Sequence, residues 1–178
     1  PILIGLMWLP FIKKISNQKY IFFLALTVGL LLFLGIDAIV EALEVSSENL
    51  AGVFHGPLLI ATVVLVSLFG LYYAGEKLTK KSSLTKLASP YSVALMVSIG
   101  IGLHNLGEGL AIGAAIGLGQ VALSTFLIIG FALHNTTEGI AIAAAVGKEK
   151  TFIRKIIELG LIAGVPAIFG TWVGGFAY

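Results

Sequence analysis

Long apolar runs separated by short polar stretches dominate this chain. A helix needs roughly twenty apolar residues to cross the hydrocarbon core of a bilayer, and five runs come close to or exceed that length. These predicted spans cover residues of about 21–43, 57–75, 91–118, 121–146 and 156–178. A shorter apolar run at about 1–12 has the character of a truncated helix end. The pattern predicts an all-α fold, a polytopic transmembrane helix bundle that forms one domain over residues 1–178.

The composition supports membrane insertion. Of the 178 residues, 58% are hydrophobic and only 11% are charged, and the mean hydropathy is +1.04. A soluble domain carries about 25% charged residues. The chain has no cysteine, so disulfides and thiolate ligands are excluded. No basic patch indicates a nucleic-acid partner, and the expected environment is the lipid bilayer.

The basic residues are all predicted to lie on one side of the membrane. If each predicted span crosses once, the loops alternate between sides, and all 11 lysines and arginines fall in loops of the same side. These residues are Lys13, Lys14, Lys19, Lys77, Lys80, Lys81, Lys86, Lys148, Lys150, Arg154 and Lys155. Because cytoplasmic loops carry an excess of Lys and Arg, the basic loops are expected to face the cytoplasm of a multi-pass cell-membrane protein.

One short polar motif occurs twice, in the middle of two neighbouring spans. The first copy reads His-Asn-Leu-Gly-Glu-Gly over residues 104–109, and the second reads His-Asn-Thr-Thr-Glu-Gly over residues 134–139. The similarity extends over fifteen positions, of which ten are identical between 103–117 and 133–147. Histidine and glutamate stand four residues apart in each copy, so both side chains project from one face of their helix.

The paired motif predicts a metal site. A charged acid at the bilayer centre costs roughly 2.5–3.5 kcal/mol on insertion scales, and one divalent cation would neutralise two carboxylates. Two imidazoles and two carboxylates suit Zn²⁺ best, and Fe²⁺ or Mn²⁺ with added oxygen ligands. Asparagine can supply such an oxygen or orient water. The predicted metal-binding residues are His104, Glu108, His134, Glu138, Asn105 and Asn135.

Two further acids interrupt the second half of the 21–43 span. Asp37 and Glu41 are candidates for a path along which an ion approaches the site. A structural acid paired within the bundle is an equally good interpretation of Asp37.

The paired motif resembles that of the ZIP (Zrt/Irt-like) family of divalent-metal transporters. The resemblance rests on His104, Asn105, Glu108 and Gly109 and on their counterparts thirty residues later. It implies a ZIP-type bundle, of which this chain covers the end of the first helix through the sixth. It also implies transport of zinc, iron or manganese ions toward the cytoplasm by alternating access. Asn135 and Val165 stand where some members have acidic ligands, which implies one strong metal site instead of a pair.

Other functions remain open at this point. A membrane-embedded metalloenzyme, a metal-binding membrane protein without transport, and a purely structural bundle are the alternatives. Zinc proteases use His-Glu-x-x-His and di-iron bundles use Glu-x-x-His, and neither pattern occurs in the chain. The protein is therefore not expected to be an enzyme. Its expected partners are metal ions as substrate and the lipid bilayer, with a homodimer as one further assembly.

Overall fold

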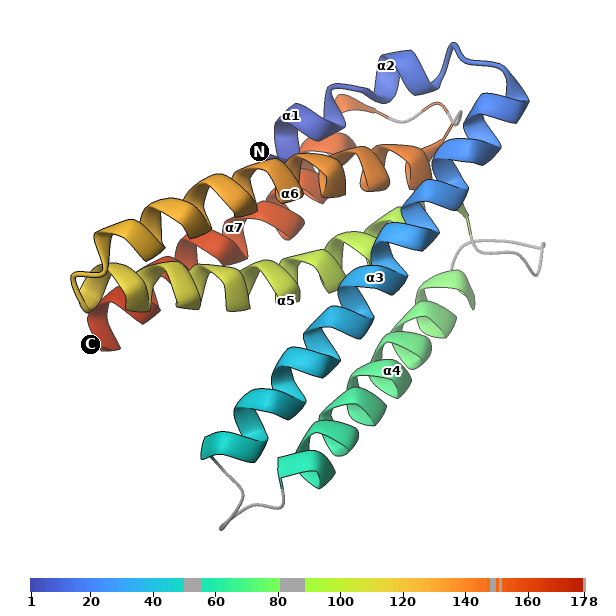
Figure 1. Cartoon of the computed structure of the whole chain (residues 1–178). Coiled ribbons are helices and arrows are strands. Elements are labelled where there is room, and N and C mark those ends of the chain that lie inside the picture. The colour runs from blue at the N-terminus through green and yellow to red at the C-terminus, as the bar shows by residue number, and fades with distance from the viewer. Residues whose placement is uncertain (50–55, 81–88, 148–149, 151, 178) are drawn as a thin grey trace. The chain divides into compact units, whose positions relative to one another are not determined.

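The structure is a computed structural model that describes residues 1–49, 56–80, 89–147, 150 and 152–177. Within these ranges the chain is helical and contains no strand, which confirms the all-α prediction (Figure 1). The helices are α1 (Ile2–Leu6), α2 (Leu9–Ile12), α3 (Asn17–Asn49), α4 (Gly56–Lys80), α5 (Pro90–Gly117), α6 (Val121–Val146) and α7 (Ile153–Ala177).

Five of these helices are long and apolar enough to cross a membrane, as a multi-pass membrane protein requires. Their candidate spans are Asn17–Glu44, Gly56–Lys77, Pro90–Gly117, Val121–Val146 and Ile153–Ala177. Each overlaps one span predicted from the sequence. Several predicted loop residues, Lys81, Lys86 and Lys148 among them, lie outside the described residues, as does the final residue, Tyr178.

The first twelve residues do not form one continuous helix, as the predicted truncated helix end would. Helices α1 and α2 are separated at Met7 and Trp8, and Pro10 occupies the first turn of α2. Proline has no amide hydrogen and cannot donate a hydrogen bond to the carbonyl of the residue four positions earlier, here Leu6. The helical ladder therefore breaks just before Pro10.

The described helices form two compact units. The second unit, 25–88, contains α4 and most of α3, and most of the apolar side chains that the structure describes in it are exposed. Asp37 lies on α3 in this unit and its side chain is exposed. Glu41 is part of the same helix, but its side chain lies outside the described part of the chain. The role of both acids in an ion path stays a prediction.

The first unit, 1–24 and 89–178, contains the duplicated motif. Helices α5 and α6 run antiparallel and are joined by a tight turn through Gly119, whose φ of 68° is in the left-handed region that favours glycine (Figure 1). The turn is so short that the middles of the two helices, where the motifs lie, are held next to each other.

Helix α7 packs on α5 through close backbone approach. A Cβ atom added at Gly102, Gly109 or Gly113 would collide with a backbone carbonyl of α7, and one added at Gly170 or Gly174 would collide with a carbonyl of α5. Small residues allow such close helix contacts in lipid, where packing replaces the hydrophobic effect as a driving force. Helix α5 is therefore held firmly against α7 along most of its length.

Helix α1 packs on α6 in the same way. Gly5 lies against the backbone of α6 at Thr136, and Gly139 lies against the backbone of α1 at Ile2. The two helices that carry the motif are thus each supported by a different neighbour. This difference gives equivalent motif residues different surroundings.

Candidate metal site

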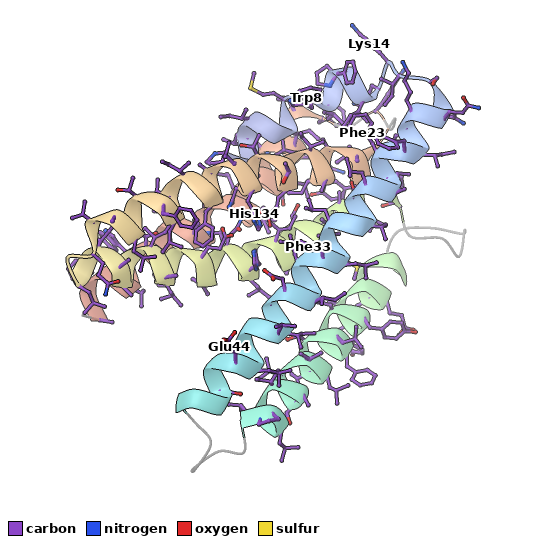
Figure 2. All side chains as sticks on the ribbon, in the orientation of Figure 1. Trp8, Lys14, Phe23, Phe33, Glu44 and His134 are labelled. Carbon is purple, nitrogen blue, oxygen red and sulfur yellow. The ribbon has the colours of Figure 1, made fainter. Side chains whose placement is uncertain are left out.

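The two histidines meet at the contact between α5 and α6. Their imidazole rings are stacked, with centroids 5.5 Å apart and planes inclined by 13°. Phe131, one turn before His134 on α6, places its ring edge-on to that imidazole, with centroids 6.5 Å apart. Figure 2 shows His134 between the ribbons of α6 and α5. These ring contacts help to fix the orientation of the His104 ring on α5 and of the His134 ring on α6.

One carboxylate oxygen lies close to both histidines. The Oε1 atom of Glu108 is 3.4 Å from Nε2 of His104 and 3.6 Å from Nε2 of His134. One ligand atom from each of the three residues lies within 4.8 Å of the others. Zinc bonds of about 2.0–2.2 Å place neighbouring ligand atoms of a tetrahedron roughly 3.3–3.5 Å apart. The two separations from Oε1 of Glu108 are close to that spacing, and the third pair of ligand atoms lies within 4.8 Å, as a cluster that could hold a small ion requires.

Glu108 and His104 lie within ion-pair distance of each other, but their facing atoms do not form a hydrogen bond. Among the described residues, neither Oε1 of Glu108 nor Nε2 of His104 has a hydrogen-bond partner, although both atoms are buried. A buried acceptor without a partner costs about 1–3 kcal/mol, and more when it is charged. A cation bound between these atoms would remove that cost. The arrangement therefore has the polarity and the spacing of a cation site.

Glu138, the acid of the second copy, lies beside this cluster. It is fully buried, and its Oε1 atom is 3.3 Å from Nε2 of His134. It is not one of the three residues whose ligand atoms converge. Neither of its carboxylate oxygens has a hydrogen-bond partner in the part of the chain that the structure describes. Glu138 thus brings a second buried acid to the site, but it contacts the cluster through His134.

The two asparagines of the motif have different partners. Asn135 donates a hydrogen bond of 2.7 Å from Nδ2 to Oε2 of Glu108. Asn105 donates one of 2.9 Å from Nδ2 to the backbone carbonyl of Ala163 on α7. Both asparagines are buried. Asn135 is therefore connected to the acid of the cluster, whereas Asn105 connects α5 to α7.

A cavity beside the site was not predicted from the sequence. It has a volume of about 390 Å³ and is lined by residues of α1, α5, α6 and α7 and by Pro1, with Glu108 and Asn135 among them. The rest of the lining is apolar, including Ile112, Ile128 and Ile168. No local sequence signal marks such a cavity, because it arises where four helices meet.

Comparisons of the chain with protein-family models, with curated proteins and with solved structures found no match. A functional interpretation therefore rests on the geometry of the site and on the motif resemblance described in the sequence analysis.

Proposed function

We propose that this protein is a divalent metal-ion transporter of ZIP type that moves zinc, iron or manganese ions across the membrane toward the cytoplasm. The observation that carries the proposal is the convergence of His104, Glu108 and His134 within apolar helices of membrane-spanning length. A carboxylate and two imidazoles at such a depth are costly in lipid unless they have a function, and intramembrane ionisable residues commonly mark ion paths.

The donor set favours transition-metal ions over magnesium or calcium. Two imidazole nitrogens and a carboxylate oxygen suit zinc and iron, and manganese when oxygen ligands are added. Calcium takes six to eight oxygen ligands, and magnesium keeps several waters. In this proposal Glu138 supplies the second negative charge, so two acids balance one divalent ion.

The placement of the two motifs also supports transport over metal binding without transport. Antiparallel helices carry the motif copies in opposite directions across the membrane, as in transporters whose sites lie at the interface of inverted repeats. Both histidine side chains are partly exposed, at 34% and 27%, whereas the Glu108 side chain is 6% exposed. An ion can approach along the imidazole edge and be neutralised by the buried acid. The basic loops face the cytoplasm in this proposal.

Uptake into proteoliposomes tests this function. The purified protein, reconstituted around a zinc-sensitive dye, should give saturable Zn²⁺ influx, and Glu108→Gln should abolish it. Absence of influx together with tight Zn²⁺ binding would instead favour a membrane metalloenzyme or a metal-binding protein without transport. Absence of both would reject a metal function.

A further inference from the structure

The two oxygens of the Glu108 carboxylate have different surroundings. Oε1 points between the two histidines, at 3.4 and 3.6 Å from their Nε2 atoms, and has no hydrogen-bond partner among the described residues. Oε2 accepts the 2.7 Å hydrogen bond from the side chain of Asn135. Oε1 is therefore the oxygen that faces an ion held by the histidines, whereas Oε2 is engaged by α6.

The group that Asn135 presents to Glu108 is its amide NH₂. A carboxylate only accepts hydrogen bonds, so an amide oxygen at 2.7 Å would repel it, whereas the NH₂ group donates. That group carries partial positive charge on its hydrogens and offers no lone pair to a cation. While this hydrogen bond is present, the amide NH₂ occupies one acceptor site of Oε2, and Oε1 is the oxygen directed at both histidines, so the arrangement favours coordination through one oxygen.

We propose that Asn135 is a positioning residue that sets the ion preference of the site by holding Glu108 in one-oxygen coordination. This inference rests on the proposed metal function and concerns which ions that same site accepts. Two nitrogens and one oxygen favour small ions that accept imidazole and few ligands, such as Zn²⁺. Ions that prefer carboxylate, carbonyl and water oxygens, such as Mn²⁺, lose the second oxygen that Glu108 would otherwise offer.

The first motif copy provides a matched control. Asn105 is also buried and also donates through Nδ2, but its acceptor is the backbone carbonyl of Ala163 on α7. Replacing it removes a buried amide and one hydrogen bond, and the lost acceptor is a backbone carbonyl instead of a carboxylate. A packing defect lowers the affinity for every ion by a similar factor. A change in the coordination of Glu108 alters the ratio of affinities.

The test is calorimetric titration of the purified protein and its Asn135→Ala, Asn135→Asp and Asn105→Ala variants with ZnCl₂ and with MnCl₂. Loss of a group that orients a metal ligand typically weakens binding by about 10- to 100-fold. We expect Asn135→Ala to lose Zn²⁺ affinity by about tenfold and Mn²⁺ affinity by less, so the Zn²⁺/Mn²⁺ affinity ratio falls. Asn135→Asp, of nearly the same size, should lower this ratio further because it adds an oxygen ligand. Asn105→Ala should keep the wild-type ratio.

An unchanged ratio in both Asn135 variants, or an equal shift in Asn105→Ala, would overturn the inference. Should the variants fail to fold, zinc-edge X-ray absorption of the Zn²⁺-loaded wild type decides the question. A one-oxygen carboxylate is expected, and a carboxylate bound through both oxygens would reject the role of Asn135. Failure of the proposed function is recognised separately, because the wild type would then bind neither ion.

Discussion

The two copies of the motif are nearly the same in sequence and differ in what they contact. In each copy the histidine Nε2 lies close to the glutamate four residues later, at 3.4 Å on α5 and 3.3 Å on α6. Only Glu108 also reaches the histidine of the other copy, at 3.6 Å. Its neighbouring asparagine, Asn105, binds α7, whereas Asn135 binds Glu108.

The difference originates in the neighbouring helices. Helix α5 is packed against α7 through Gly109, and α6 is packed against α1 through Gly139. A repeated motif therefore does not give its members equal roles, because each copy meets a different partner. We infer that Glu108, which faces both histidines, contributes more to ion binding than Glu138, which faces only His134.

The largest expected effect is that of Glu108→Gln. The substitution removes the negative charge of the acid that lies between both histidines. Loss of a group that only orients a metal ligand weakens binding by up to about 100-fold. Loss of the ligand charge itself should therefore lower Zn²⁺ affinity by about 100-fold or more. Calorimetric titration measures this change. The control is Glu158→Gln, an exposed acid on α7, which should bind Zn²⁺ like the wild type. Similar losses in both variants would reject the assignment of Glu108 as a ligand.

Acidic pH should weaken Zn²⁺ binding through the histidines of both motif copies. Imidazole and carboxylate bind a metal in their deprotonated forms, so metal binding releases protons and affinity falls as the pH falls. An imidazole in water is about nine-tenths protonated at pH 5.5, so two histidine ligands predict a loss of about 10- to 100-fold between pH 7.5 and 5.5. Zn²⁺ titrations across this range, with circular dichroism to verify the fold, measure it. A flat profile would exclude histidine ligands.

The packing of α5 at the first motif copy can be disturbed without replacing His104 or Glu108. Gly109→Ala places a methyl group against the α7 backbone at Ala167 and should lower the free energy of unfolding by about 1–3 kcal/mol. Gly107→Ala is the control, because a Cβ atom there meets open space and alanine favours a helix. Unfolding in a denaturing detergent compares the two. Equal stability would show that α5 and α7 are not in close contact at this point.

Glu138→Gln should have the smallest effect on binding among these changes. Its Oε1 atom lies beside Nε2 of His134 and, unlike that of Glu108, not between the two histidines. We therefore expect a loss of Zn²⁺ affinity of about tenfold, the low end of the range for groups next to a metal ligand. The measurement is the titration used for Glu108→Gln. A loss as large as that of Glu108→Gln would mean that the two acids share the ion equally and would remove the asymmetry between the copies.

Hydropathy was sufficient to predict the helices, because crossing lipid leaves few alternatives to long apolar helices. The four-residue spacing of histidine and glutamate was sufficient to place each pair on one helix face. The break before Pro10 and the different partners of the two asparagines were not predicted. They depend on which helix packs on which, and small residues such as Gly109 and Gly139 permit close approach without specifying the partner.

The short turn at Gly119 also bears on how the site is assembled during folding. The three converging residues belong to one helical hairpin, so their meeting requires closure of a small loop and no contact between distant parts of the chain. Local contacts of this kind form early and rapidly. The three converging side chains can therefore come together as soon as this hairpin has entered the bilayer, before α7 has been added and the Asn105 amide has found its acceptor.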